Sequence, residues 1–172
     1  MPASAVGTLL IIDDSELVLE VVASGFQEEG WTVFTAETGA NGLLIAAKVE
    51  EIEAVICDLH LGDISGYDVV DRLAEARPDL PVIMLSGDDD LGAVVVAMRR
   101  GAFDYVVKSD LGPLLASAER AVRHYRALRR ERALLAQASG VVSALCTIAA
   151  RLASAGDQAT AQELVRLADR LR

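Results

Sequence analysis

Reactive side chains stand at the ends of four short apolar runs in this sequence: Asp13 with Asp14, then Asp58, Ser86 and Lys108. Three carboxylates brought together repel one another, so a cation has to offset their charge. Oxygen ligands of this kind suit Mg²⁺. A bound Mg²⁺ would let Asp58 stay ionised and attack a phosphoryl group. Lys108 and Ser86 would then bind the phosphoryl oxygens, which is chemistry by positioning and charge neutralisation.

Each of these residues also has a purely structural explanation. The pair Asp13 and Asp14 could cap a following helix, and Asp58 could be a turn residue. Ser86 or Lys108 alone would be a weak signal. The functional interpretation is favoured because all of them fall at the ends of successive apolar runs.

The elements that would position these residues alternate along the first 125 residues. Five strand-like runs are expected near residues 9–12, 31–36, 54–57, 82–85 and 105–107. Helical patterns follow each of them, at 15–29, 38–51, 65–76, 91–100 and from about residue 113. This alternation predicts an α/β fold with a parallel sheet covered by helices on both faces. The carboxyl ends of such strands share one edge of the sheet, where chemistry gathers.

The motifs resemble those of the receiver domain of bacterial two-component response regulators. They are Ile11–Ser15, Val55–Leu61 followed by Gly66, Val82–Gly87 and Gly101–Lys108. The resemblance covers residues 7–125 and is highly specific. It implies a flavodoxin-like, five-stranded parallel sheet of order 2-1-3-4-5, and phosphotransfer from a sensor histidine kinase.

The resemblance also implies a role for each residue of the metal site. Asp58 would be the phosphoacceptor and would bind Mg²⁺ as well. Asp14 would bind the metal directly, Asp13 mainly through water, and the backbone carbonyl of His60 would complete the protein ligands. The imidazole of His60 could tune the water that removes the phosphoryl group, or it could be an exposed loop side chain.

Ser86 and Tyr105 match the family's switch pair. Phosphorylation would draw the Ser86 hydroxyl toward the phosphoryl group, and the Tyr105 ring would rotate inward behind it. Two positions depart from the family pattern. Ser109 follows Lys108 where the family has a proline in a cis peptide, so that loop should be strained or differently routed, because a cis bond before a non-proline residue costs about 2.5–4 kcal/mol. Gly62 replaces a usual proline, which should loosen the loop after Asp58.

Composition limits the remaining possibilities. The chain is 52% hydrophobic, which suffices for a core, and no apolar run reaches the roughly 18 residues that a membrane span needs. The first eight residues contain no Lys or Arg and predict no signal peptide, so we expect a cytoplasmic protein without a membrane anchor. Cys57 and Cys146 both lie in apolar runs and are expected to be buried, reduced thiols.

Charge separates the chain into an acidic body and a mildly basic tail. Residues 1–112 contain 6 Lys or Arg and 21 Asp or Glu, whereas residues 113–172 contain 10 Arg and 5 Asp or Glu. We expect a receiver domain at 1–125 and a helical extension at 126–172. In the extension, Gly140 should end the long helix, and two short amphipathic helices should follow, the second capped by Asp157 or Thr160.

The amphipathic tail helices need a partner for their apolar faces. We expect a homodimer through the tail, with an interface that includes Leu145, Ile148, Leu152, Leu164 and Leu167. Docking of another protein remains an alternative. A tail that binds RNA or DNA would make the chain a transcription or antitermination regulator, but few base-reading side chains accompany its arginines, so nucleic acid is not the expected partner. No enzymatic activity is expected beyond self-phosphotransfer and hydrolysis at Asp58.

Overall fold

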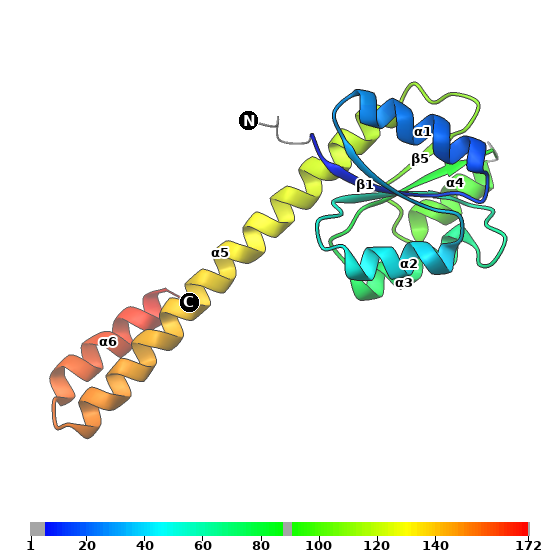
Figure 1. The fold of residues 1–172 in the computed structure, drawn as a ribbon. Coiled ribbons are helices and arrows are strands. Elements are labelled where there is room, and N and C mark those ends of the chain that lie inside the picture. The colour runs from blue at the N-terminus through cyan, green and yellow to red at the C-terminus, as the bar shows by residue number, and fades with distance from the viewer. Residues whose placement is uncertain (1–5, 88–90, 172) are drawn as a thin grey trace. The chain divides into compact units, whose positions relative to one another are not determined.

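A computed structural model describes residues 6–87 and 91–171 of the chain (Figure 1). The first five residues, on which part of the prediction about a signal peptide rests, lie outside the described residues. The chain divides into two compact units, one up to Arg126 and one from Ala127 onward. The predicted domain boundary after residue 125 lies next to this division, and the assignment of a receiver domain and a helical extension with these bounds stays a prediction.

The first unit is built on a five-stranded parallel sheet. Its strands are β1 (Thr8–Ile12), β2 (Thr32–Ala36), β3 (Ala54–Asp58), β4 (Val82–Ser86) and β5 (Asp104–Val107). Their order is β2-β1-β3-β4-β5, which confirms the predicted fold. Every residue of β3 and β4 is buried, as expected for central strands covered on both faces.

Helices cover both faces of this sheet (Figure 1). They are α1 (Glu16–Glu28), α2 (Gly39–Lys48), α3 (Gly66–Ala76), α4 (Leu91–Arg99) and the first turns of α5 (Leu114–Ser154). Phe26 of α1 and Ala118 of α5 share one apolar cluster with Ile11 and Ile56, so α1 and α5 lie on the same face. The cluster on the other face contains Val69 of α3 together with residues of α2 and α4.

The helix starts follow local capping chemistry. The hydroxyl of Thr38 accepts a hydrogen bond from the Asn41 N–H, as the sequence predicts. Ser15 occupies the N-cap position of α1, but its side chain makes no capping hydrogen bond. Instead, the Ser15 N–H donates to Asp13 Oδ1 at 2.9 Å. The Asp13 carboxylate, which follows β1, therefore fixes the backbone at the start of α1.

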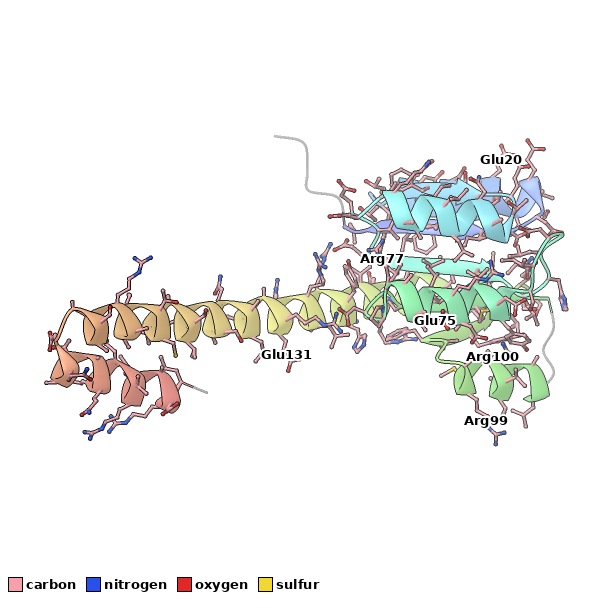
Figure 2. All side chains as sticks on the ribbon, turned by 90° about the horizontal axis from the view of Figure 1, so that it is seen from below. Glu20, Glu75, Arg77, Arg99, Arg100 and Glu131 are labelled. Atoms are coloured by element: carbon pink, nitrogen blue, oxygen red, sulfur yellow. The ribbon has the colours of Figure 1, made fainter. Side chains whose placement is uncertain are left out.

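Arg77, which follows α3 and is labelled in Figure 2, ties together three parts of the first unit. Its guanidinium donates hydrogen bonds to four backbone carbonyls, those of Ala46, Val49, Glu50 and Ile52. It also donates to the hydroxyl of Tyr125 in α5, at 3.0 Å. One side chain therefore joins the end of α2, the segment before β3 and the long helix.

Replacing Arg77 with methionine should lower the free energy of unfolding by about 3 kcal/mol, because several carbonyls and a hydroxyl lose a charged donor together. Urea denaturation of both proteins would measure this. Arg72→Met provides the control, since Arg72 is an exposed side chain of the same helix; a change of at most about 0.5 kcal/mol is expected there. Equal losses in the two variants would show that the Arg77 network contributes little.

The second unit consists of the rest of α5 and the helix α6 (Gln158–Arg170). The prediction that Gly140 ends the long helix is wrong, because α5 continues without a break to Ser154. A glycine inside a helix costs only about 1 kcal/mol relative to alanine, and no proline follows this one. The tail therefore has one long helix segment and one short helix. Asp157 caps α6, accepting a hydrogen bond from the Thr160 N–H.

The two tail helices pack through small side chains. Ala149 of α5 and Ala161 and Ala168 of α6 are buried. Of the residues predicted to form a dimer interface, Leu145, Leu152 and Leu164 are half-buried, whereas Ile148 and Leu167 are exposed. The predicted interface is thus partly used inside the tail itself. By contrast, Leu134 and Leu135 are 66% and 62% exposed.

By length and composition, α5 could cross a membrane. An 18-residue window of this helix has a mean hydropathy of 1.7, and 6% of the window is buried. Residues 133–150 contain no charged side chain. Small polar residues interrupt the apolar runs here, as predicted, but they do not lower the average enough to keep the helix below the criterion for a membrane span. A single helix of this kind is a weak indication, since helices of soluble proteins meet the same criterion.

Candidate functional site

The predicted site residues lie together at one edge of the sheet. Asp13 directly follows β1, Asp58 and Ser86 end β3 and β4, and Lys108 directly follows β5. Because these strands are parallel, their carboxyl ends meet at the same edge. Backbone hydrogen bonds extend the alignment beyond the strands: the Lys108 N–H donates to the Ser86 carbonyl at 2.7 Å.

Three carboxylates converge at this edge. Ligand atoms of Asp13, Asp14 and Asp58 lie within 4.8 Å of one another. Asp13 and Asp58 are buried, and Asp14 is exposed. The Lys108 ammonium contacts two of them, with Nζ at 2.7 Å from Asp13 Oδ2 and 3.1 Å from Asp58 Oδ2. The constellation expected from the sequence is therefore assembled.

Burial and ion pairing oppose each other in this cluster. Burial raises the pKa of the Asp58 carboxyl above its ordinary value, although the nearby Lys108 partly offsets this effect. For Lys108, burial acts to lower the pKa, but hydrogen bonds to Asp13 and Asp58 outweigh it, so the pKa is raised. Lys108 therefore stays protonated near neutral pH.

The donor set fits Mg²⁺. Lys108 supplies one positive charge against three carboxylates, which leaves the cluster with an excess of negative charge. A hard divalent cation with carboxylate ligands would compensate it. Asp14 faces solvent, so the metal could keep several of its waters, as Mg²⁺ prefers.

The loop after β3 is folded tightly beneath Asp58. The Leu59 N–H donates to Asp58 Oδ1 at 2.8 Å and thereby orients the carboxylate. The Gly66 N–H donates to the Leu59 carbonyl, and His60 pairs with Ser65 in an isolated antiparallel bridge. A Cβ atom on Gly66 would lie 2.1 Å from the Asp58 carbonyl oxygen. Glycine is therefore required at this position of the motif for steric reasons.

The loop after Lys108 is differently routed rather than strained. All peptide bonds of the described residues are trans, including the bond between Lys108 and Ser109. The Asp110 N–H donates to the Val107 carbonyl, and the Gly112 N–H donates to Asp110 Oδ1. The chain thus reaches α5 through a hydrogen-bonded turn without the family's cis proline.

The predicted switch residues differ in burial. Ser86 is buried at the end of β4, and Tyr105 is half-buried against the apolar cluster beneath α2, α3 and α4. The predicted coupling between them stays a prediction. The imidazole of His60 is exposed, which agrees with both roles considered for it.

Two further residues lie at this edge: Cys57, predicted to be a reduced thiol, and Asp63, which the sequence analysis does not single out. Cys57, next to the phosphoacceptor, is fully buried, and its thiol donates to the Asp58 carbonyl. Burial raises the pKa of this thiol far above its usual range, so it is no competing nucleophile. Asp63 reaches from the loop after β3 to the start of α2. No sequence signal marks that contact, because it joins residues more than twenty positions apart.

Comparison with known proteins agrees with this geometry. Residues 9–119 match the response regulator receiver domain. The probable transcriptional regulatory protein TcrX of Mycobacterium tuberculosis is 32% identical over 77% of this chain and 54% of its own length. The photosynthetic apparatus regulatory protein RegA of Rhodovulum sulfidophilum is 40% identical over 59% of this chain and 55% of its own length. This chain thus spans about half the length of these relatives.

A solved structure shares the fold. The response regulator TrrA of Thermotoga maritima, in complex with Mg²⁺ and BeF, has a TM-score of 0.61 and 26% identity, and the match covers 67% of this chain and 98% of that chain. The family match covers more than half of the sequence, and the strand order, the carboxylate cluster and the lysine agree with it. The chain therefore belongs to the response regulator receiver domain family of two-component systems.

Proposed function

We propose that this protein is a two-component response regulator that accepts a phosphoryl group on Asp58 from a sensor histidine kinase. The observation that carries the proposal is the placement of Asp58 within the carboxylate cluster, with Lys108 Nζ 3.1 Å from its carboxylate. Mass spectrometry after incubation with acetyl phosphate and Mg²⁺ should detect one added phosphoryl group. Failure to detect any adduct, under conditions where the protein is folded, would contradict the proposal.

Each residue of the site has a distinct part in this reaction. An oxygen of Asp58 attacks the phosphorus, and the bond from phosphorus to the kinase histidine breaks, so that the imidazole keeps the electron pair. Lys108 and the Ser86 hydroxyl bind oxygens of the transferred group. Mg²⁺, when bound, neutralises charge on the phosphoryl oxygens. Asp13, Asp14, Asp58 and the His60 carbonyl would hold it.

Asp14→Asn should weaken Mg²⁺ binding more than Asp13→Asn. A ligand that acts through water belongs to the outer shell, so the expected loss for Asp13 is about tenfold; the loss for Asp14 should be larger because direct ligation is removed. Isothermal titration calorimetry would measure both. Glu16→Gln removes a nearby carboxylate outside the cluster and should leave the affinity unchanged. Unchanged affinity in both Asp variants would refute the assigned metal site.

We further propose that the output is a protein–protein contact made by the tail, and that its partner is a second copy of the chain. Exposed apolar side chains lie along α5 and α6, among them Leu134, Leu135, Ile148 and Leu167. Residues 1–112 repel their counterparts electrostatically, so the attraction would come from the tail. Phosphorylation would act on this assembly through Ser86 and Tyr105.

Nucleic-acid binding is the second candidate output. TcrX is described as a probable transcriptional regulatory protein, and NtrC of Proteus hauseri, 34% identical over 70% of this chain and 25% of its own length, is described as a DNA-binding transcriptional regulator. These descriptions give no support to our expectation that nucleic acid is not a partner. The arginines of the tail would have to supply the binding. Its affinity for DNA or RNA would then fall steeply with rising salt, whereas dimerisation through leucines would not.

The remaining assignments follow from the same proposal. The protein would have no enzymatic activity other than self-phosphotransfer and hydrolysis of the acyl phosphate at Asp58. Its place would be the cytoplasm, where sensor kinases present their phosphohistidine.

A further inference from the structure

Asp63 links the loop that carries the phosphorylation site to another helix. Asp63 is exposed and lies between β3 and α3. Asp63 Oδ1 accepts a hydrogen bond from the Gly39 N–H at 2.9 Å, and Oδ2 accepts one from the Ala40 N–H at 2.8 Å. Both oxygens of one carboxylate are thus held by the first two residues of α2.

The start of α2 favours a carboxylate at this position. The first N–H groups of a helix have no partner within the helix, and they carry the positive end of its dipole. Thr38 satisfies the N–H of Asn41, and Asp63 satisfies the two before it. These bonds, that of Ala40 above all, hold the pKa of the Asp63 carboxyl below its ordinary value. The contact is therefore made by the charged carboxylate.

Apolar packing closes the same contact. A Cβ atom on Gly39 would lie 2.5 Å from Cγ1 of Ile64, so the Ile64 side chain of the loop would have to move to admit a side chain at position 39. At its base, the loop is closed by the bridge between His60 and Ser65. The two ends of the segment from His60 to Ser65 are therefore joined to each other, and its middle is joined to α2.

We infer that Asp63 is a positioning residue for phosphoryl chemistry at Asp58. This inference rests on the proposed function. By anchoring the loop to α2, Asp63 holds the His60 carbonyl where the metal needs it, without touching metal or phosphoryl group itself. Gly62 stands where the family has a restraining proline, and a Cβ atom there would meet nothing within 4 Å. The carboxylate of the next residue supplies the restraint instead.

The test compares two caps of the same helix. Asp63→Ala and Thr38→Ala each remove capping hydrogen bonds from the start of α2, but only Asp63 belongs to the phosphorylation loop. For each full-length variant we would measure thermal unfolding, the Mg²⁺ dissociation constant by calorimetry and the rate of phosphorylation by acetyl phosphate. Asp63 positions the loop that carries a ligand without bonding to the ligand itself, so Asp63→Ala should weaken Mg²⁺ binding by at most about tenfold, the lower end of the range for groups that orient metal ligands, and should slow phosphorylation at subsaturating Mg²⁺. Thr38→Ala should leave both unchanged.

Asp63→Asn keeps an acceptor oxygen without the charge and should fall between the wild type and Asp63→Ala. Hydrogen exchange of the Gly39 and Ala40 amides should speed up in Asp63→Ala while the sheet stays protected. If Asp63→Ala and Thr38→Ala alter Mg²⁺ binding equally, Asp63 is only a helix cap and the inference is wrong. A wild-type protein that neither binds Mg²⁺ nor becomes phosphorylated would overturn the proposed function itself, so the two failures are distinguishable.

Discussion

Asp58→Asn should abolish phosphorylation of this protein by acetyl phosphate and Mg²⁺. The amide is nearly isosteric with the carboxylate, so the fold should persist, but it lacks the nucleophilic oxygen that attacks phosphorus. Asp58 is buried beside Lys108 and two further carboxylates. A bound metal ion and the Lys108 ammonium can therefore orient its carboxylate oxygen toward a phosphodonor. Intact-mass measurement over a time course would show the phosphorylated species in the wild type and not in the variant.

Asp68→Asn is the matched control for this experiment. Asp68 is an exposed carboxylate in the first turn of α3, ten residues beyond Asp58. This variant should be phosphorylated at the wild-type rate. Equal labelling of Asp58→Asn and the wild type would show that another residue accepts the phosphoryl group.

Removing two exposed leucines from α5 should convert the proposed dimer to a monomer. Burial of one leucine side chain contributes roughly 1.5–3 kcal/mol, so replacing both Leu134 and Leu135 with glutamate removes a large favourable term and places charges in the interface. Light scattering and sedimentation would measure the mass. Gln137→Glu adds a charge to the same helix without removing an apolar side chain and should leave the dimer intact.

Truncation after Arg130 is the complementary test of the tail. The shortened protein should be monomeric at concentrations where the full chain is dimeric. If it dimerises as tightly as the full chain, the receiver supplies the interface and the tail does not. A full-length protein that is monomeric at all concentrations would contradict the dimer and leave the tail as a docking site for a different partner.

The site could be predicted from sequence because its signals are local. Each reactive residue ends or directly follows a strand, and parallel topology alone brings Asp13, Asp58 and Lys108 to one edge. The strand order came from the resemblance to a family rather than from periodicity, since alternation of strands and helices does not specify which strands are neighbours. Burial of the central strands followed directly from their unbroken apolar runs.

The features that sequence reasoning missed depend on distant contacts or on small energies. Asp63 meets α2 only in the folded chain, and the bonds of Arg77 to the end of α2 are equally non-local. At Gly140, the cost of a helical glycine is too small to end a helix when no proline accompanies it, so α5 continues through this position. The route of the loop after Lys108 was also not predictable from sequence. The family's cis proline indicates that the chain turns there, but this chain makes the turn with a trans Lys108–Ser109 bond.

The two cysteines give this protein a built-in difference in chemical accessibility. Cys57 is fully buried next to the phosphorylation site, whereas Cys146 is half-buried in the tail. A maleimide dye added to the native protein would therefore attach at Cys146, because attack requires an accessible thiolate. A single-site fluorescent conjugate of the tail can thus be made without mutagenesis. Labelling of a second thiol would, in turn, signal that the receiver sheet has opened.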